Sequence, residues 1–332
     1  MGVRIGINGF GRIGRLVLRA GINDPDLEFV AINDITDAKT LAYLFKYDSI
    51  HGRFKGDVTA SDDGFTIDGK KIKIYAERDP SDIPWDKHNI DIVVEATGIF
   101  RKREQANKHL KGSVKKVLIS APAKGHDGTF VKGVNFDQYD PVKHNVICIG
   151  SCTTNCLAPV VKVLHDNYKV AKAFMTTIHA YTNDQKILDL PHSDHRRARA
   201  AALSMIPTTT GAAKAIAEVI PEMKGRIDGL AIRVPTPDGS LVDLVAELET
   251  DVTIEQINAE MKKAADGPMK GVLEYTEESI VSIDVVGNPH SSVFDAQMTM
   301  VTGGKMVKVF SWYDNEWAFS CRMIEMLKMM MG

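Results

Sequence analysis

A cysteine within a polar turn is the residue of this chain best suited to covalent chemistry. Cys152 lies in Gly150-Ser-Cys-Thr-Thr-Asn-Cys156, after an apolar run that predicts a buried strand and before apolar spacing that predicts a helix. The first N–H groups of a helix are unpaired and its dipole is positive there, so we expect this position to favour the thiolate, the nucleophilic form of cysteine. A buried structural cysteine is the alternative, but a turn in the core has no need of so many polar neighbours. We therefore predict that Cys152 is a nucleophile.

A histidine at the end of another predicted strand is the candidate partner of that sulfur. His179 stands near the end of the run Phe174–Ala180 and just before the polar residues Tyr181–Asp184. A lone histidine in such a place is more often structural. A thiol nucleophile, however, needs a base or an ion-pair partner, and His192 and His195 lie in a loop. The sequence therefore predicts that His179 acts on Cys152.

A glycine-rich turn near the start of the chain has the spacing of a dinucleotide site. The motif Gly9-Phe-Gly-Arg-Ile-Gly14 falls between a predicted strand, Val3–Asn8, and a predicted amphipathic helix, Arg12–Ala20. Its first glycine permits the tight turn, Gly11 lets the backbone approach a pyrophosphate, and the third glycine lets helix and strand pack closely. The diphosphate would rest on the N-terminus of the helix.

An acidic residue ends the next predicted strand, Phe29–Asn33. Asp34 in that position would bond the ribose hydroxyls of the dinucleotide and repel a 2′-phosphate, which favours NAD over NADP. A cap for the predicted helix Ala38–Lys46 is the alternative role. Thr97 and Ser120 also follow predicted strands and would reach the carboxyl edge of the sheet, where such folds bind ligands, although ordinary turn chemistry explains them equally well.

Arginines in the second half of the chain suggest anion sites. The cluster His195–Arg199 precedes the threonine-rich turn Ile206–Gly211, and arginine forks beside hydroxyl and N–H groups are typical phosphate ligands. A solvated face or an interface is the alternative. Arg233 lies in a predicted strand between apolar neighbours, where an unpaired charge would be costly. We expect a bound anion as its partner, with the carboxylate of Asp243 as the alternative.

These residues need two kinds of scaffold. With 332 residues the chain is long for a single core, so two domains are expected. In residues 1–150 strands alternate with helices, which predicts a Rossmann-type, mostly parallel sheet. Residues 151–315 have longer strands and fewer crossover helices, which predicts an α+β catalytic domain with a largely antiparallel sheet. We expect the C-terminal helix, residues 316–332, to pack back on the first domain.

Further strands are expected in both halves of the chain. In the first half we expect strands at residues 71–75, 91–95, 116–120 and 145–149, with residues 66–69 forming one arm of an inserted hairpin. In the second half we expect long strands at residues 171–180, 229–236, 240–248 and 301–313. The fold class is therefore α/β with an α+β catalytic part.

Composition limits the classes of partner. The net charge of −2 gives no reason to expect nucleic acid or an anionic membrane as the main partner, and no apolar run reaches the length of a membrane span. The 4 cysteines are too few for a disulfide framework. Cys152 and Cys156 could form half of a metal site, but no second pair with ligand spacing completes it, so we expect no metal. These features predict a cytoplasmic protein.

Several long motifs taken together resemble the family of phosphorylating glyceraldehyde-3-phosphate dehydrogenases. They are Ile7-Asn-Gly-Phe-Gly-Arg-Ile-Gly14, Ser151-Cys-Thr-Thr-Asn-Cys156, Arg196-Arg-Ala-Arg-Ala-Ala-Ala202 and Trp312-Tyr-Asp-Asn-Glu-Trp317. The resemblance runs from Val3 to the last helix. It implies NAD-dependent oxidation of D-glyceraldehyde 3-phosphate, with inorganic phosphate as the second substrate, through a cysteine thioester to 1,3-bisphosphoglycerate and NADH.

The resemblance also implies a role for each matching residue. Cys152 would be the nucleophile and His179 the group that activates it and removes a proton during hydride transfer. NAD would be held by the glycine loop and by Arg12, Ile13, Asp34, Arg78, Thr97, Ser120 and Asn315, with Asn315 near the nicotinamide carboxamide. The substrate phosphate would be held by Thr182 and Arg233, whereas Ser151, Thr153, Thr210, Gly211 and Arg197 would serve the aldehyde and the incoming phosphate. The family is typically a homotetramer, in which the Pro191 loop would lie close to a neighbouring subunit's cofactor.

Two positions differ from the pattern of the family, and two other functions remain open. Gly150 replaces the usual alanine. Pro159 lies inside the helix that Cys152 begins, so we expect a kink near Asn155 or a separate first turn.

An erythrose-4-phosphate dehydrogenase is one alternative function, because it would use the same thiol and cofactor. A non-catalytic NAD- or RNA-binding scaffold would have the same fold without turnover.

Overall fold

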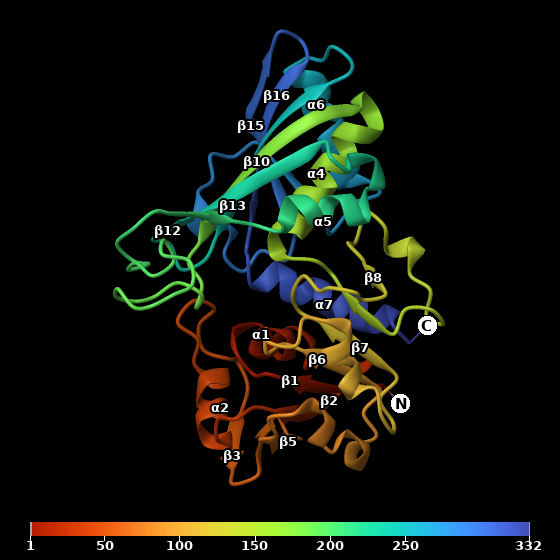
Figure 1. The fold of residues 1–332 in the computed structure, drawn as a ribbon, viewed down its shortest axis with the longest axis vertical. Coiled ribbons are helices and arrows are strands. Elements are labelled where there is room, and N and C mark those ends of the chain that lie inside the picture. Colours follow the sequence, from red (N-terminus) through yellow and green to blue (C-terminus); the bar gives the residue numbers. More distant parts are fainter. Residues whose placement is uncertain (1, 332) are drawn as a thin grey trace. The chain divides into compact units, whose positions relative to one another are not determined.

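The computed structural model describes residues 2–331, which divide into two compact units (Figure 1). The first unit contains residues 1–130, 138–150 and 320–332, and the second contains residues 131–137 and 151–319. Residues 131–137 therefore group with the second unit although they precede the expected boundary at residue 150.

A nine-stranded sheet forms the core of the first unit, with the strand order β3-β4-β5-β2-β1-β6-β7-β9-β8. The strands are β1 (Val3–Asn8), β2 (Leu27–Asn33), β3 (Val58–Ser61), β4 (Gly64–Ile67), β5 (Lys70–Tyr75), β6 (Ile92–Glu95), β7 (Lys116–Ile119), β8 (Gly128–Thr129) and β9 (Val146–Cys148). All neighbours from β5 to β8 in this order pair in parallel, and β3, β4 and β5 pair antiparallel. The Rossmann-type parallel sheet and its inserted hairpin are thus confirmed.

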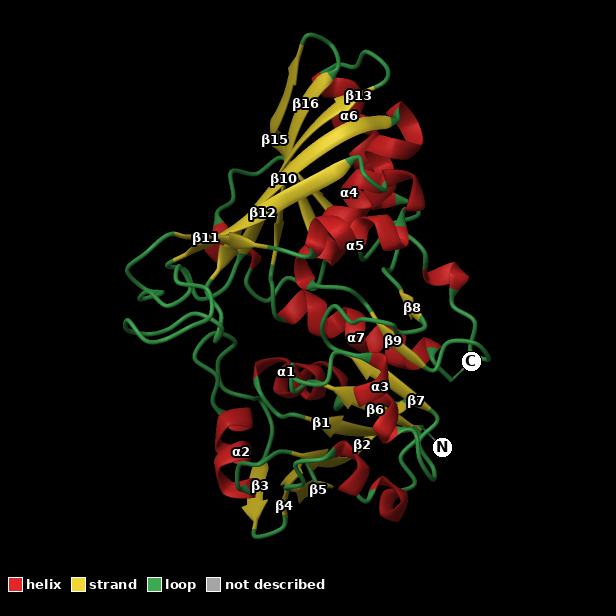
Figure 2. Ribbon diagram, viewed as in Figure 1, coloured by secondary structure: helices red, strands yellow, loops and turns green. Residues whose placement is uncertain are grey.

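The first unit also contains the helices α1 (Arg12–Gly21), α2 (Ala38–Lys46) and α3 (Arg103–Ala106) (Figure 2). Helix α7 (Trp317–Met329) belongs to this unit from Ser320 onward. Lys328 of α7 forms ion pairs with Asp24 at 3.0 Å and with Asp26 at 3.1 Å, just after α1. These ion pairs join the end of α7 to the segment between α1 and β2.

In the glycine loop between β1 and α1, the backbone leaves no room for a side chain at Gly9 and Gly14. Gly9 has a φ of 91°, and a Cβ atom there would lie 2.5 Å from the backbone nitrogen of Thr97. A Cβ atom on Gly14 would lie 2.2 Å from the carbonyl oxygen of Gly9. At Gly11 a Cβ atom would meet nothing within 4 Å, so this residue faces open space at the start of α1. The turn, the close packing and the open approach expected of the three glycines are all present.

A seven-stranded, mostly antiparallel sheet forms the core of the second unit, in the order β11-β12-β10-β13-β16-β15-β14. The strands are β10 (Val170–Ala180), β11 (Ile206–Thr209), β12 (Ile227–Val234), β13 (Ser240–Leu248), β14 (Leu273–Thr276), β15 (Ser292–Thr302) and β16 (Met306–Tyr313). The helices α4 (Cys152–Tyr168), α5 (Ala212–Val219) and α6 (Ile254–Asp266) pack together, and their buried apolar residues join those of the sheet in one core (Figure 2).

Two details of the second unit differ from the expectations. Residues 301–313 are not one strand, because Gly303 and Gly304 have φ values of 59° and 75° and turn the chain between β15 and β16. Helix α4 runs without interruption through Pro159, so its first turn is not separate. No helix in residues 2–331 is long and apolar enough to cross a membrane.

The glycine loop leads to a test of packing. We expect Gly14→Ala to lower the free energy of unfolding by about 1–3 kcal/mol, because the added methyl group collides with backbone that cannot move aside. Urea denaturation of the full chain measures this change. Gly11→Ala is the matched control, and it should shift the same transition by less than about 1 kcal/mol. A Gly14→Ala variant as stable as the wild type would contradict this account of the loop.

Candidate active site

The N-terminus of α4 positions Cys152. Ser151 caps the helix, since its Oγ accepts a hydrogen bond from Thr154 N–H at 3.0 Å, while the Thr154 hydroxyl lies 3.2 Å from the Ser151 nitrogen. Gly150, just before the cap, has a φ of 72°, a conformation that suits glycine better than the family's alanine. Cys152 is the first helical residue, and as a whole residue it is neither fully buried nor fully exposed.

The end of β10 brings His179 to that sulfur. The distance from Cys152 Sγ to His179 Nε2 is 3.5 Å, so the two residues that the sequence singled out form a contact. His179 is 4% exposed, and its Nδ1 lies 2.7 Å from the carbonyl oxygen of Ala180. Its ring also meets the edge of the Tyr313 ring, with centroids 5.9 Å apart.

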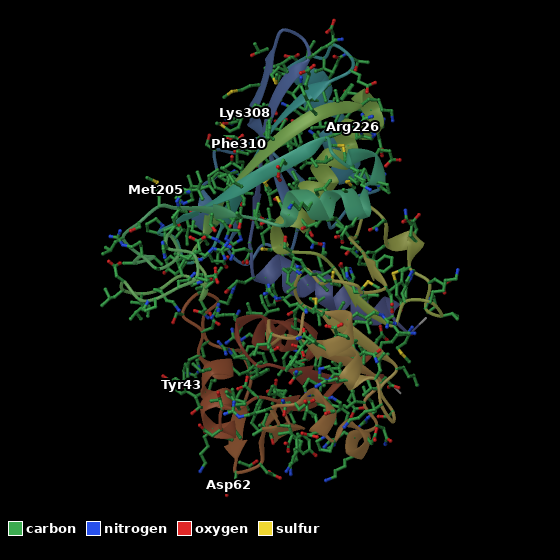
Figure 3. The ribbon with its side chains drawn as sticks, in the orientation of Figure 1. Tyr43, Asp62, Met205, Arg226, Lys308 and Phe310 are labelled. Atoms are coloured by element: carbon green, nitrogen blue, oxygen red, sulfur yellow. The ribbon has the colours of Figure 1, made fainter. Side chains whose placement is uncertain are left out.

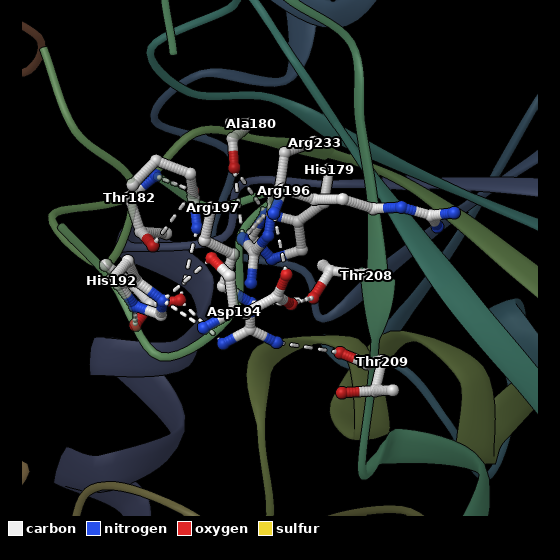
Figure 4. Close-up of polar contacts among 12 residues, drawn as sticks. His179, Ala180, Thr182, His192, Asp194, Arg196, Arg197, Thr208, Thr209 and Arg233 are labelled. Atoms are coloured by element: carbon white, nitrogen blue, oxygen red, sulfur yellow. Dashed lines mark hydrogen bonds and ion pairs between the residues drawn. The ribbon is translucent and has the colours of Figure 1, made fainter. Parts of the chain in front are cut away.

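Arg233 is the third ionisable residue of the site, after Cys152 and His179. It lies beside His179 (Figure 4). Strands β10 and β12 pair in parallel with His179 opposite Arg233, and Arg233 Nη1 lies 2.6 Å from His179 Nδ1 and 3.1 Å from Ala180 O. The alternative partner, Asp243, instead pairs with Lys308 at 2.8 Å. The buried Nε of Arg233 has no hydrogen-bond partner among the described residues, so a donor remains for a ligand.

Burial is the largest influence on the pKa values of Cys152 and His179. Burial raises the pKa of the Cys152 thiol above its ordinary value of 9.0, against the opposing effects of Arg233 and of the Thr153 N–H and hydroxyl groups. Burial, together with the charge of Arg233, lowers the pKa of His179 to about 3. The helix start favours the thiolate, but burial of the sulfur opposes it and raises the pKa of the thiol on balance.

A thiolate at this site depends on the imidazole. Each group by itself prefers the neutral form, but a thiolate and an imidazolium 3.5 Å apart attract each other strongly in a poorly solvated site. The ionised form is reached by moving the proton from sulfur to Nε2, so the two residues titrate as a unit.

Two of the residues expected to bind substrate, Thr182 and Arg197, lie on loops of the second unit (Figure 4). Thr182 N–H donates to Gln185 Oε1 at 2.9 Å, and the Thr210 hydroxyl accepts from Ala212 N–H at 3.1 Å at the start of α5. Gly211 is the N-terminal cap of α5, and a Cβ atom there would meet nothing within 4 Å. Thr210 and Gly211 thus stand at the start of α5, whereas Thr182 lies in the loop after β10.

The side chains of Arg197 and Thr153 also have protein partners. Arg197 pairs with Asp184 at 2.7 Å and donates to the Thr208 hydroxyl at 2.6 Å, so an incoming anion would compete with a carboxylate. The Thr153 hydroxyl is buried and lies 2.8 Å from the hydroxyl of Tyr313. Its contact with Tyr313 is a structural role that the sequence did not indicate.

The expected cofactor residues of the first unit gather at the carboxyl edge of its parallel sheet. Asp34 Oδ2 accepts a hydrogen bond from Phe10 N–H in the glycine loop at 2.8 Å. Asp34 does not cap α2, since Asp37 does so by accepting from Thr40 N–H at 2.9 Å. The alternative role considered for Asp34 is thus wrong.

Other cofactor candidates of the first unit lie in α1 and after strands β5 and β7. Arg12 forms an ion pair with Asp48 at 2.7 Å. Burial acts to raise the pKa of Asp48, but the His51 N–H and the Arg12 guanidinium lower it to about 2. Ile13 is half-buried, and Arg78 is exposed after β5. Ser120 follows β7, and its N–H donates to the carbonyl oxygen of Glu95 at 2.9 Å.

A buried polar network supports Thr97, and sequence reasoning missed it. Glu95, at the end of β6, accepts hydrogen bonds from Thr97 N–H at 2.9 Å and Asn8 Nδ2 at 2.6 Å, and also from the Thr97 hydroxyl. His109 Nε2 lies 3.1 Å from the same carboxylate, while Trp85 Nε1 donates to His109 Nδ1 at 3.1 Å. The one available signal was a charged residue closing an otherwise apolar strand.

Asn315, expected near the nicotinamide, belongs to the second unit. Its side-chain oxygen accepts a hydrogen bond from the Ser240 hydroxyl at 2.6 Å, and Ser240 Oγ accepts from Ala180 N–H at 3.1 Å. Ala180 directly follows His179, so this relay connects Asn315 to the strand end that carries the imidazole.

A Rossmann-type unit with a dinucleotide loop and a second unit with a thiol–imidazole pair define a class, the nicotinamide-dependent dehydrogenases that act through a cysteine. Comparison with known proteins makes the assignment specific. Residues 3–103 match the family described as glyceraldehyde 3-phosphate dehydrogenase, NAD binding domain, and residues 151–315 match its C-terminal domain. The chain belongs to the glyceraldehyde-3-phosphate dehydrogenase family.

Individual relatives cover nearly the whole chain. The glyceraldehyde-3-phosphate dehydrogenase of Geobacillus stearothermophilus is 59% identical over 326 residues, which are 98% of this chain and 97% of the relative. Glyceraldehyde-3-phosphate dehydrogenase 1 of Bacillus subtilis is 56% identical over 326 residues, again 98% of this chain and 97% of the relative. Glyceraldehyde-3-phosphate dehydrogenase 2 of a Nostoc species is 50% identical over 330 residues, 98% of each chain. The similarity therefore includes both units.

The pair of Cys152 and His179 leads to a test of reactivity. In His179→Asn the sulfur keeps its burial and loses the base, so its raised pKa leaves it as a thiol at neutral pH. We expect alkylation by iodoacetamide at pH 7 to slow by at least about tenfold, and to recover as the pH rises through the ordinary thiol range and beyond. Mass spectrometry of the Cys152 peptide over time measures the rate.

Asn retains much of the size of the imidazole, so a loss of packing is not the cause of the expected change. Equal alkylation rates for the variant and the wild type at pH 7 would contradict the role of His179.

Proposed function

We propose that this chain oxidises D-glyceraldehyde 3-phosphate with NAD and inorganic phosphate, giving 1,3-bisphosphoglycerate and NADH. The observation that carries the proposal is the 3.5 Å contact between Cys152 Sγ and His179 Nε2 in a chain whose family acts through NAD. The chain is thus an NAD-dependent oxidoreductase of glycolysis.

The first step is the formation of a carbon–sulfur bond. As Cys152 attacks the aldehyde carbon, His179 Nε2 takes the sulfur proton, and the carbonyl electrons move to oxygen. The Cys152 backbone N–H, at the first position of α4, and His179 are the candidate donors for that oxygen. The His179 imidazolium then returns its proton to that oxygen, so the product of this step is a neutral hemithioacetal on Cys152 and His179 is again a neutral base.

The second step is oxidation to a thioester. His179 removes the hydroxyl proton of the hemithioacetal while the carbon loses a hydride and the carbonyl bond forms again. NAD, when bound, accepts that hydride. The thioester keeps the acyl group activated, so a phosphate oxygen can attack the carbonyl carbon, break the carbon–sulfur bond and release an acyl phosphate.

Two anion sites serve this sequence of steps. We assign the phosphate of the substrate to Thr182 and Arg233, because the buried Nε of Arg233 has a donor to offer. We assign the incoming phosphate to Ser151, Thr210 and Gly211, supported by the open approach to the N-terminal cap of α5. Thr153 and Arg197 contribute to that second site only if their present partners, Tyr313 and Asp184, release them.

The cofactor site is assigned to the residues around the glycine loop. Gly9, Gly11 and the first N–H groups of α1, at Arg12 and Ile13, form the candidate diphosphate cradle. Asp34, Arg78, Thr97 and Ser120 would hold the adenosine half, and Asn315 the carboxamide. The contact of Asp34 with Phe10 N–H supports this assignment, because it holds the carboxylate beside the loop.

We also propose a homotetramer in the cytoplasm. Its support is a set of large apolar side chains that the isolated chain leaves in solvent, with Ile187 87%, Leu203 81%, Met205 74% and Phe174 73% exposed. Figure 3 marks Met205 on the second unit. Side chains of this size and number need a cover, and a second copy of the chain can supply it. Light scattering should give about four times the chain mass of 36.5 kDa.

One assay tests the proposed reaction. Purified chain should form NADH from glyceraldehyde 3-phosphate only when phosphate is present, and much more slowly from erythrose 4-phosphate. Cys152→Ser should lose all but a few per cent of turnover while its affinity for NAD stays within about twofold of the wild type, because serine is a poor nucleophile at this site. Turnover that does not need phosphate, or that survives in Cys152→Ser, would refute the proposal.

Asp34 leads to a test of cofactor choice. In Asp34→Asn the side chain can still accept the Phe10 N–H bond but has lost its charge, so it no longer repels a 2′-phosphate. We expect the preference for NAD over NADP, as the ratio of kcat/KM values, to fall by at least about tenfold. Steady-state kinetics with both cofactors measure it, and an unchanged ratio would show that Asp34 does not approach the ribose.

A further inference from the structure

Ser240 is a buried hydroxyl beside the catalytic strand that the reaction steps above do not use. It is the first residue of β13, it is 1% exposed, and it pairs with Tyr313 of β16 in the register of the sheet. Its Oγ accepts the Ala180 N–H at 3.1 Å and lies 2.6 Å from Asn315 Oδ1. A serine in this position joins two loops that are distant in the sequence.

The hydrogen bonds of Ser240 determine which way round the Asn315 amide lies. Because Ser240 Oγ already accepts from Ala180 N–H, its own proton points to the neighbouring Asn315 side chain. An acceptor is needed there, so Oδ1 and not the NH₂ group faces the serine. If the amide were turned over, the Ser240 proton would lose its acceptor inside the protein, at a cost of about 1–3 kcal/mol.

The backbone on both sides of Asn315 is also held. Asn315 N–H donates to Asp238 Oδ1 at 3.3 Å, and Asp314 Oδ1 accepts from Glu316 N–H at 2.8 Å and from Trp317 N–H at 2.6 Å. The remaining freedom of Asn315 is therefore the rotation of its side-chain amide. Ser240 is the group that restricts it.

The consequence is a donor aimed at a ligand. Asn315 is 7% exposed, and within residues 2–331 no protein acceptor contacts its Nδ2. An amide whose oxygen is occupied and whose NH₂ group is unused recognises a carbonyl oxygen. The carboxamide of nicotinamide carries such an oxygen on the ring that takes part in hydride transfer.

We propose that Ser240 is a positioning residue for the dinucleotide, whose hydroxyl holds the Asn315 amide so that Nδ2 meets the carbonyl oxygen of the carboxamide. The proposal rests on the proposed function, because it needs a nicotinamide at Asn315. It assigns Ser240 no contact with the substrate or with the reacting atoms.

The test compares NAD with its thionicotinamide analogue, in which sulfur, a weak acceptor, replaces the carbonyl oxygen. In Ser240→Ala the Asn315 amide is free to turn over, so we expect the ratio of kcat/KM for NAD to that for the analogue to fall by about fivefold. The intrinsic reactivities of the two cofactors cancel when the variant is compared with the wild type. Ser240→Thr keeps the hydroxyl and should retain the wild-type ratio to within about twofold.

Two further measurements separate this role from a general structural one. If Ser240 acts through Asn315, then Ser240→Ala made in an Asn315→Ala background should not change the ratio further. The alkylation rate of Cys152 without cofactor should stay within about twofold of the wild type in Ser240→Ala, because the thiol–imidazole pair is intact. Should Ser240→Ala fold poorly by circular dichroism, Ser240→Cys, with a similar shape and a weaker donor, replaces it.

The possible results distinguish a failure of the proposed function from a failure of the inference about Ser240. A wild-type chain that does not reduce NAD refutes the proposed function and this inference with it. An active wild type with an unchanged ratio in Ser240→Ala refutes the inference alone. So does a loss of turnover that is matched by an equal loss of Cys152 alkylation, because Ser240 would then act through His179.

Discussion

The contact between the sulfur of Cys152 and the imidazole of His179 depends on two elements that meet only in the folded second unit. Helix α4 brings the sulfur at its first residue, and β10 brings the imidazole near its end. Both elements are held by the same apolar core, which includes Val160, Leu164 and Met175. A shift of α4 along the sheet by a fraction of a turn would separate the two groups, so the packing of this core is a condition for the chemistry.

Burial has opposite effects on this pair. It works against a charge on either group alone, which is why the helix start does not suffice to ionise the thiol. It also keeps water from weakening the attraction between the two charges once the proton has moved. Arg233 acts against burial at Cys152 and with burial at His179, since its charge favours a thiolate and disfavours an imidazolium. A phosphate bound to Arg233, as proposed above, would offset that charge and make His179 a better proton acceptor.

Features that depend on residues close together in the sequence could be predicted. The glycine loop, the hairpin before β5 and the alternation of strands with helices all follow from local patterns, and Cys152 was recognisable because polar residues surround it in a strand-to-helix turn. Strand β15 was missed because the expected strand, residues 301–313, ran across Gly303 and Gly304, whose positive φ values end one strand and allow the next to begin.

The features that sequence reasoning could not reach involve contacts between distant residues. The network of Glu95 with His109 and Trp85 joins residues on separate strands and loops, and no spacing within the chain indicates it. Ser240 and Asn315 are 75 positions apart, and only the pairing of β13 with β16 brings them together. The burial that raises the pKa of Cys152 likewise comes from the whole second unit.

The covalent intermediate offers the most direct measurement of the central claim that the sulfur of Cys152, activated by His179, carries the acyl group. Wild-type chain is mixed with NAD and glyceraldehyde 3-phosphate in buffer free of phosphate, quenched in acid within seconds and digested for mass spectrometry. The account requires about one NADH per chain and the added mass of a phosphoglyceroyl group on the Cys152 peptide, which disappears when phosphate is added before the quench. An added mass on a different peptide, or NADH formed with no acyl group on Cys152, would contradict it.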